Sequence, residues 1–245
     1  MNREIGVELY VFGPEARNAE ALSLRILPAL RHYGYACVES FAQPLELPEL
    51  LKRAGLRLAG VHLATGQLAK PEKYVAFAKA GGCADLCVSG PLNWKSRGRD
   101  DYLATAKFLN ESAKRLAGEG LRLHYHNHEF EFARIDGGLT ALEVLLAELD
   151  PAVDLCLDAG WVWAAGVDAA ALLRRHAERI GFLHLRDFRG PDSVALGAGE
   201  VPLAEHLRAV AALPRLRELI VEHDPITPDP LGAMRASLEW LRANG

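Results

Sequence analysis

Three side chains that commonly bind divalent metal ions end successive apolar runs in the second half of the chain. They are Asp158, His184 and Glu222. Each has an ordinary explanation when taken alone, as a turn aspartate, a core histidine or a rim glutamate. A shared site explains better why they recur on three successive runs. Carboxylate and imidazole ligands suit Mn²⁺, Mg²⁺, Co²⁺, Fe²⁺ or Zn²⁺, and no thiolate accompanies them to favour the softest ions. We therefore expect a divalent-metal centre.

A cluster of histidines forms the second chemical feature. His124, His126 and His128 alternate with Tyr125 and Asn127. Side chains alternate between the two faces of a strand, so the three imidazoles share one face. Stacked imidazoles are a costly way to fill a core, whereas they can bind a metal ion or transfer protons near neutral pH. We expect this strand to contribute to the site.

Four further residues are candidates for contacting a small polar substrate, namely Glu8, His62, Trp161 and Arg186. Arg186 follows His184 by two residues on the same face, where it could hold a substrate hydroxyl, carboxylate or phosphate, or form a structural ion pair. Glu8 and His62 end earlier apolar runs, so they either line the same mouth or lie behind the residues that line it. Trp161 could form an apolar wall against a sugar ring or pack against a helix.

Two other motifs are weaker. The glycine-rich stretch 196–200 could cap a pocket or touch a phosphate. Cys83 and Cys87 could form half a zinc site, but no second cysteine pair follows in the sequence. We therefore expect both to be small core residues.

A regular alternation of short and long segments positions these residues. Eight apolar runs recur about every 30 residues, and each precedes a stretch with helical periodicity. The runs begin at residues 5, 35, 56, 84, 121, 153, 180 and 218. The expected helices span residues 19–33, about 48–54, 71–80, 101–117, 140–149, 168–179, 202–213 and 229–243. Repeated units of this kind favour parallel strands, because each return needs a crossover helix.

This alternation predicts an α/β protein, a single (β/α)₈ TIM barrel over residues 1–245. The competing fold is an open, doubly wound sheet. It is disfavoured because no Gly-x-Gly-x-x-Gly turn follows the first run, and because polar residues end many runs instead of gathering at one switch point. In a barrel the carboxyl ends of all strands meet at one mouth, so Asp158, His184 and Glu222 can be neighbours.

Composition limits the classes of function. Half of the residues are hydrophobic and the net charge is −4, which fits a globular protein with no general attraction to nucleic acid or an anionic membrane. No apolar run is long enough to span a membrane, and the start of the chain lacks the pattern of a signal peptide. Four scattered cysteines fit a reduced compartment, so we expect a cytoplasmic protein.

The second half of the chain resembles a known family. Residues 125–132 (YHNHEFEF), 157–161 (LDAGW), 183–188 (LHLRDF) and 221–224 (VEHD) are similar to segments of the sugar phosphate isomerase/epimerase family of xylose isomerase-like TIM barrels. The resemblance is most specific over residues 121–241 and more general before them.

This resemblance implies a metal ion with one ligand from each of strands five to eight. Asp158, His184 and Glu222 match the ligands from strands six, seven and eight. The strand-five ligand of the family's epimerases is usually glutamate, but here His126, or else His124, takes that place. Those epimerases use the strand-five and strand-eight glutamates as opposed acid/base groups, so this chain must move the second proton differently.

The activity implied is a metal-dependent isomerase or epimerase that acts on a small polyhydroxy carbonyl compound through an enediolate. Glu222 would move one proton together with a strand-five histidine, with His128 or Glu129 as the second carrier. The alternatives are an inosose-type dehydratase or lyase on the same site and a non-catalytic, sugar-binding relative. An activity like that of endonuclease IV is disfavoured, since Trp161 stands where that nuclease has a histidine. The resemblance also suggests a homodimer.

Overall fold

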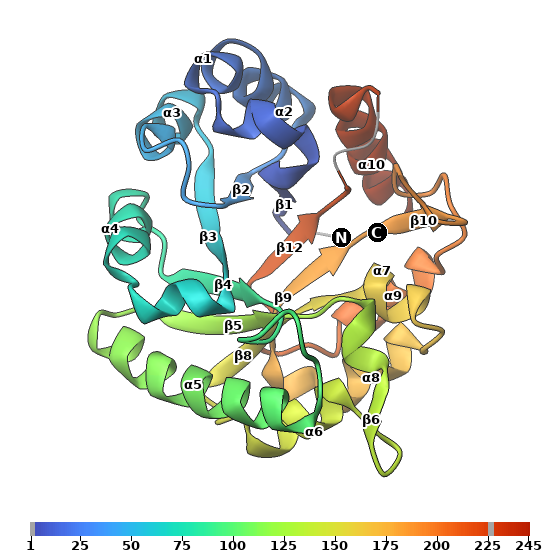
Figure 1. The fold of residues 1–245 in the computed structure, drawn as a ribbon. Coiled ribbons are helices and arrows are strands. Elements are labelled where there is room, and N and C mark those ends of the chain that lie inside the picture. Colours follow the sequence, from blue (N-terminus) through green and yellow to red (C-terminus); the bar gives the residue numbers. More distant parts are fainter. Residues whose placement is uncertain (1–2, 225–227) are drawn as a thin grey trace.

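The computed structural model describes residues 3–224 and 228–245, in which eight parallel strands close into a barrel surrounded by helices (Figure 1). The strands are β1 (Ile5–Glu8), β2 (Cys37–Ser40), β3 (Arg57–Ala64), β4 (Asp85–Ser89), β5 (Arg122–His126), β8 (Val153–Asp158), β9 (Ile180–Leu185) and β12 (Glu218–Val221). β1 pairs with β2 on one side and with β12 on the other, which closes the barrel. The (β/α)₈ prediction is confirmed, and each expected apolar run contributes one strand. Residues 1–2 and 225–227 of the predicted domain lie outside the described part.

The helices cover the outside of the barrel (Figure 1). They are α1 (Ala19–Ala21), α2 (Leu27–Tyr33), α3 (Leu47–Ala54), α4 (Glu72–Ala80), α5 (Arg99–Gly118), α6 (Ala141–Glu148), α7 (Ala159–Ala164), α8 (Ala169–Arg175), α9 (Leu203–Val210) and α10 (Pro230–Asn244). The remaining segments are of two kinds. The 3₁₀ or π segments are η1 (Leu9–Arg17), η2 (Leu22–Ile26), η3 (Thr65–Ala69), η4 (Glu129–Phe132) and η5 (Ala177–Arg179). The two hairpins are β6 (Arg134–Asp136) with β7 (Leu139–Thr140) and β10 (Asp187–Arg189) with β11 (Asp192–Val194). Within residues 3–224 and 228–245, no helix combines the length and the apolar character needed to cross a membrane.

The helix expected over residues 19–33 is divided. The π turn η2 separates α1 from α2, and Pro28 is the second residue of α2. Proline is tolerated in the first turn of a helix but removes a hydrogen bond from the interior, so the regular helix restarts at this point.

Helix α7 is absent from the predicted helices, and it begins at the expected metal ligand Asp158. The Asp158 Oδ1 atom accepts a hydrogen bond of 2.9 Å from the backbone N–H of Trp161, which caps the helix. Gly160 permits a close approach to β9, because a Cβ atom there would lie 2.6 Å from Cβ of Arg186. The sequence Asp-Ala-Gly thus ends a strand, starts a helix and brings that helix against the next strand.

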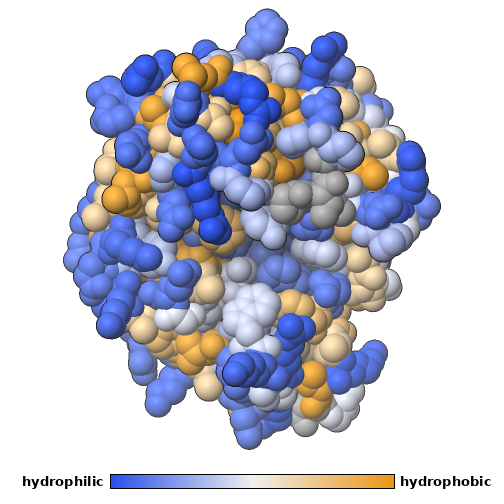
Figure 2. Space-filling model, turned by 45° about the horizontal axis from the view of Figure 1, so that its top comes forward, coloured by the Kyte–Doolittle hydropathy of each residue, from blue (hydrophilic) through white to orange (hydrophobic). Residues whose placement is uncertain are grey.

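The apolar core has two parts. A large cluster lies between the sheet and the helices, and a small cluster fills the barrel interior. The interior cluster consists of Cys37, Ala59, Cys87, Cys156, Phe182 and Ile220. All four cysteines are buried and free, as expected for core residues. On the face shown in Figure 2, hydrophilic side chains predominate and hydrophobic ones form small separate groups.

A network of charged side chains occupies the amino-terminal end of the barrel. His124 Nε2 lies 2.7 Å from Asp85 Oδ1, and Arg122 forms a bidentate ion pair with the same carboxylate. Arg217 binds Asp154 at 2.8 Å and reaches the His124 ring at 3.3 Å. A network of this kind at the amino-terminal end of a barrel serves stability, because the site-forming loops are at the other end.

Candidate metal centre and active site

Four side chains from the later strands meet at the carboxyl end of the barrel. They are His126 of β5, Asp158 of β8, His184 of β9 and Glu222, which follows β12. One possible ligand atom from each lies within 4.8 Å of the others, and all four side chains are buried. Parallel strand pairing places these side chains at similar depths in the barrel, as the register of Asp158 in β8 with His184 in β9 shows. The structure therefore brings together the four residues expected to bind the metal ion.

The choice between the two strand-five histidines follows from depth in the barrel. His126 ends β5, and its ring centre lies 4.9 Å from that of His184. His124 lies one layer lower and pairs with Asp85 at the opposite end. The structure therefore brings His126, and not His124, to the other three residues, although both rings share the inner face as expected.

Of these four residues, Glu222 and His126 are in the forms that bind a metal ion, whereas burial raises the pKa of Asp158. Burial lowers the pKa of His184, but the charges of Cys156 and Glu39 outweigh burial and raise this pKa well above its usual value, so a metal ion would have to displace a proton from His184. Burial raises the pKa of Glu222, but Arg186 and His184 outweigh burial and hold this pKa at about 2. Burial, and next the charge of His184, keep the pKa of His126 well below its usual value, so this imidazole is neutral. Neutral imidazole and ionised carboxylate are the forms that bind metal ions. Two imidazoles and two carboxylates are thus a donor set that fits a divalent ion such as Mn²⁺ or Zn²⁺.

Arg186 is a central part of this site and is buried. Its guanidinium donates to Asp158 Oδ2 at 3.0 Å and to Asp224 Oδ1 at 2.9 Å, and it pairs with Glu222 Oε1 at 2.7 Å. Of the two alternatives left open by the sequence, the ion pair is therefore present. Its guanidinium carbon also lies 4.8 Å from the centre of the Trp161 ring.

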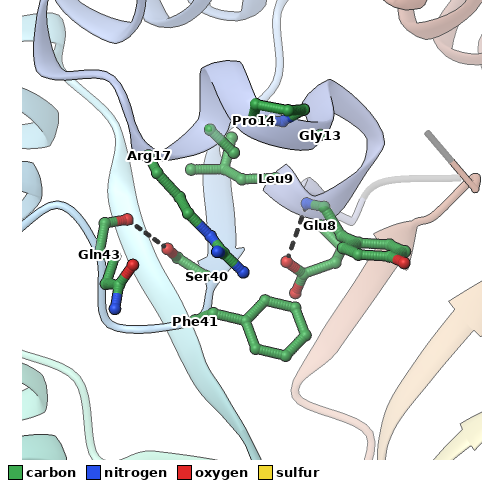
Figure 3. Close-up of a pocket in the computed structure, with 10 residues that line it drawn as sticks. Glu8, Leu9, Gly13, Pro14, Arg17, Ser40, Phe41 and Gln43 are labelled. Carbon is green, nitrogen blue, oxygen red and sulfur yellow. Dashed lines mark hydrogen bonds between the residues drawn. The ribbon is translucent and has the colours of Figure 1, made fainter.

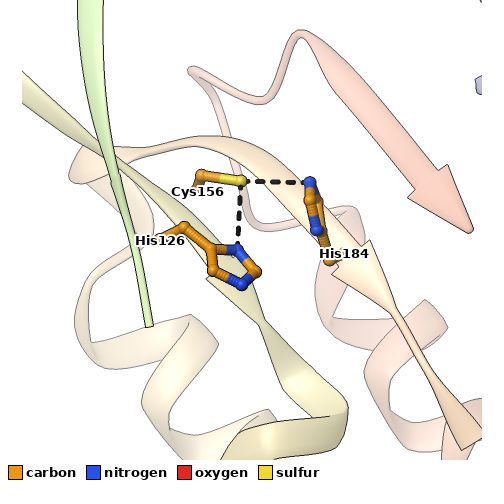
Figure 4. A group of neighbouring side chains, drawn as sticks. All are labelled: His126, Cys156 and His184. Atoms are coloured by element: carbon orange, nitrogen blue, oxygen red, sulfur yellow. Dashed lines mark hydrogen bonds between the residues drawn. The ribbon is translucent and has the colours of Figure 1, made fainter. Parts of the chain in front are cut away.

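Cys156 lies beside the site, although no pattern in the sequence indicated a thiol there. Its Sγ atom lies 3.1 Å from Nε2 of His184 and 3.7 Å from Nδ1 of His126 (Figure 4). Cys156 precedes Asp158 by two residues and so lies below it on the inner face of β8. The thiol comes close to the two histidines because inward-facing positions of neighbouring strands stack in layers.

The earlier strands contribute a second polar group to the mouth. Nδ1 of His62 lies 3.4 Å from Oε1 of Glu39 and 3.9 Å from Oε2 of Glu8. Burial, and next the nearby charge of Glu39, raise the pKa of Glu8 well above its usual value. Burial lowers the pKa of His62, but its contacts with Glu39 outweigh burial and raise this pKa to about 9. Glu39 had no predicted role, and its only signal in the sequence is its place near the end of the second apolar run.

A pocket opens beside this second group. It has a volume of about 350 Å³ and is lined in part by Glu8, Tyr10, Arg17 and Phe41 (Figure 3). Phe41 stacks on the ring of His62, with ring centres 5.1 Å apart. The pocket thus extends from the buried polar groups to the surface between η1 and the segment after β2.

Aromatic side chains form the opposite wall. Trp161 lies 5.0 Å from Phe188 and 6.2 Å from His128, measured between ring centres. Trp94 contacts His128 from the other side at 5.8 Å and is 41% exposed. The aromatic rings therefore surround the polar centre, an arrangement suited to the apolar faces of a small carbohydrate.

The two candidates for a second proton carrier differ in position. The His128 ring lies 5.0 Å from the His126 ring, and burial lowers the pKa of His128 to about 4. Glu129 is exposed in η4, so the structure does not bring it to the cluster. The buried carboxylate of this turn is Glu131, which accepts hydrogen bonds from the Tyr125 hydroxyl at 2.8 Å and from the His128 backbone N–H at 2.7 Å.

The glycine-rich stretch after β11 has its backbone donors engaged. Asp187 Oδ2 accepts from the N–H groups of Gly197 and Gly199, at 2.8 and 2.9 Å. Its Oδ1 atom accepts from Val201 at 3.1 Å. These amides are directed at a protein carboxylate, which argues against the phosphate-binding role considered for this stretch.

The chain belongs to the family of xylose isomerase-like TIM barrels, and the sequence model of that family matches residues 27–244. A rhizopine catabolism protein, MocC of Rhizobium meliloti, is 32% identical over 119 residues, which is 48% of this chain. The match spans only 36% of that relative's length.

Solved structures with the same fold include sugar isomerases or epimerases and a dehydratase. A sugar phosphate isomerase/epimerase from Parabacteroides distasonis is 18% identical with a TM-score of 0.83, covering 99% of this chain and 94% of that chain. The probable 3-DHS dehydratase AsbF from Bacillus anthracis is 12% identical with a TM-score of 0.76, covering 98% and 99%. At these identities the likeness shows a common fold.

Proposed function

We propose that this protein is a divalent-metal-dependent isomerase or epimerase of a small polyhydroxy carbonyl compound. Its metal ion would be held by His126, Asp158, His184 and Glu222. The observation that carries the proposal is the convergence of these four ligand atoms within 4.8 Å at the carboxyl end of the barrel. Membership of the xylose isomerase-like family agrees with it.

The reaction needs a C–H bond next to a carbonyl group to lose its proton and regain it. A divalent cation at this site would polarise the carbonyl and stabilise the negative charge of an enediolate. Glu222 is ionised, with Oε1 paired to Arg186 and Oε2 facing Nδ1 of His184 at 2.6 Å, and Oε2 would be the atom that accepts the proton. Glu222 is therefore our candidate base on one face of the substrate.

The second proton would be handled by a strand-five histidine. His128 is neutral at pH 7 and lies beside His126 at the mouth, so it would accept the proton from one epimer while Glu222 delivers a proton to the opposite face. In the reverse direction Glu222 would accept the proton, and His128 would deliver one that it takes up from solvent. His128 would thereby take the proton-transfer role of the glutamate that the family's epimerases have on this strand. Glu129 is not assigned as the second proton carrier, because its side chain is exposed to solvent.

The surrounding residues would orient the substrate. Arg186 offers buried N–H donors to a hydroxyl or carbonyl oxygen, while Trp161 and Phe41 provide apolar surfaces on opposite sides of the centre. Glu8 and His62 line the same mouth. We expect a cytoplasmic protein with a small-molecule substrate and no nucleic-acid or membrane partner, and a homodimer as in the family resemblance.

The test combines metal binding with proton exchange. Protein treated with a chelator is reloaded with Mn²⁺, Co²⁺ or Zn²⁺ and incubated in D₂O with a panel of ketoses and inososes. We expect deuterium incorporation at a carbon next to the carbonyl, and nuclear magnetic resonance distinguishes epimerised from dehydrated products. Metal binding without any exchange would favour the sugar-binding relative, and the absence of both would refute the proposal.

A further inference from the structure

Three buried side chains on the other half of the mouth form a second group of potential ligands. Glu8 ends β1, Glu39 lies in β2 and His62 lies in β3. The three side chains are at most 3% exposed, and one ligand atom from each lies within 4.8 Å of the others. They come from strands that supply none of the four candidate ligands described above.

The atoms that face one another in this group make no hydrogen bond, although His62 and Glu39 are close enough to form an ion pair. Glu8 Oε2, Glu39 Oε1 and His62 Nδ1 are buried without a hydrogen-bond partner in the part of the chain that the structure describes. The other carboxylate oxygens are engaged, since Glu8 Oε1 accepts from the backbone N–H of Tyr10 at 3.1 Å and Glu39 Oε2 contacts His184 Nε2 at 2.8 Å. Buried polar atoms almost always have partners, so three that converge on one point require an explanation.

The spacing of these atoms is close to that of metal ligands. Two ligands that each lie about 2.1 Å from a metal ion are separated by roughly 3.0–3.4 Å in octahedral or tetrahedral geometry. Here Nδ1 of His62 lies 3.4 Å from Oε1 of Glu39, at the edge of this range, and 3.9 Å from Oε2 of Glu8, so the Glu8 carboxylate would have to move inward to bind the same ion. Phe41 stacks on the His62 ring and holds its orientation. We propose that Glu8, Glu39 and His62 bind a second divalent cation, which makes the mouth of the barrel a two-metal centre.

The balance of charge leaves room for a second cation. The mouth contains four buried carboxylates, Glu8, Glu39, Asp158 and Glu222, and one buried guanidinium, that of Arg186. If all four carboxylates are ionised, Arg186 and one divalent ion leave one buried negative charge, which is balanced either by a second cation or by a proton on Glu8 or His62. The competing explanation is that a protonated His62 takes the place of the cation, and a count of bound metal ions separates the two.

The test is the number of metal ions per chain. Protein stripped with a chelator is saturated with Mn²⁺, separated from free metal by gel filtration and analysed by mass spectrometry. We expect about two ions for the wild type and about one for His62→Gln or Glu8→Gln. The control Glu131→Gln removes a buried carboxylate outside the barrel interior, and we expect it to retain about two. Electron paramagnetic resonance gives a second readout, because neighbouring Mn²⁺ ions couple and a lone ion does not.

The outcomes also separate this proposal from the proposed function, on which it does not depend. One ion in the wild type that is retained in His62→Gln and lost in Asp158→Asn overturns the second site and preserves the first. One ion that is lost in His62→Gln and retained in Asp158→Asn supports the second site and overturns the first. If the wild type binds two ions, loss of both from a folded His62→Gln or Glu8→Gln variant, judged by circular dichroism, overturns the assignment of two separate ligand sets. Either variant suffices, so a folding failure in one of them leaves the other to decide.

Discussion

Glu39 on β2 reaches across the barrel interior to His184 on β9, with Oε2 of the carboxylate 2.8 Å from Nε2 of the imidazole. The two strands are not neighbours, since β1 and β12 lie between them in the sheet. The other ring nitrogen, Nδ1, faces Glu222 at 2.6 Å. A carboxylate on one nitrogen fixes the ring orientation and leaves the other nitrogen directed at the candidate metal site.

This relationship predicts that Glu39 tunes the affinity of the first site. Metal bound at the second site would contribute to the measured affinity, so that site is removed in both proteins. The His62→Gln variant is compared with the His62→Gln/Glu39→Gln double variant. We expect the Mn²⁺ affinity to fall about 10- to 100-fold, as is typical when a partner of a metal-binding histidine is lost. Isothermal titration calorimetry measures the change. Equal affinities in the single and double variants would contradict a positioning role for Glu39.

Asp158→Asn tests the candidate ligand without removing the start of α7. The asparagine carbonyl can still accept the hydrogen bond from the Trp161 N–H, so the helix cap is retained. Again in the His62→Gln background, we expect the Mn²⁺ affinity to fall by more than about 100-fold, beyond the loss typical of an outer partner. His124→Gln, at the other end of the barrel, is the control and should bind Mn²⁺ normally. A normal affinity in Asp158→Asn would remove this residue from the site.

Gly160→Ala tests the close approach of α7 to β9. The added Cβ would lie 2.6 Å from Cβ and 2.9 Å from the carbonyl oxygen of Arg186, so α7 must shift. We expect the free energy of unfolding to fall by about 1–3 kcal/mol, as for other overpacked sites, with weaker Mn²⁺ binding because Asp158 moves with the helix.

The matched control for this change is Gly118→Ala at the end of α5. There, no heavy atom among the described residues lies within 4 Å of the added Cβ. Alanine is the better helix former by up to about 1 kcal/mol, so we expect unchanged or slightly higher stability. Urea unfolding measures both variants, and equal effects at the two positions would refute the packing argument.

His206 in α9 predicts a dependence of stability on pH. The side chain is 1% exposed, and neither ring nitrogen has a hydrogen-bond partner within residues 3–224 and 228–245. Burial lowers the pKa from 6.5 to about 4, although the charges of Asp168 and Asp187 oppose this shift. The unfolded chain therefore binds a proton more readily than the folded chain between these two pH values, and stability falls as the pH drops below 6.5.

The size of this effect can be measured by substitution. Between pH 7 and pH 5 the pKa difference corresponds to a loss of about 2 kcal/mol from this one group. His206→Leu should remove that part of the loss, so the variant and the wild type should diverge on acidification in urea unfolding at the two pH values. Parallel behaviour of the two proteins would show that His206 is not the responsible group.

Much of the barrel and part of the site follow from local pattern. Alternation of apolar runs with helical stretches predicts eight βα units, since the pattern is set by which faces must be buried. Asp158, His184 and Glu222 could be identified from the sequence because each ends an apolar run at its carboxyl end, where the fold places all strand ends together. Alternation also placed His124 and His126 on one face, but it could not say which of them is deep enough to reach the mouth.

The sequence by itself determined the order of the strands, the inner face of each and the chemical types at their ends. Only the tertiary structure decided which of these groups touch. The contact of Glu39 with His184, the sulfur of Cys156 below the site and the group formed by Glu8, Glu39 and His62 all join strands far apart in the chain. The physical reason is that strand tilt and register set the depth of each side chain when the sheet closes, and neither is encoded in the spacing within one strand.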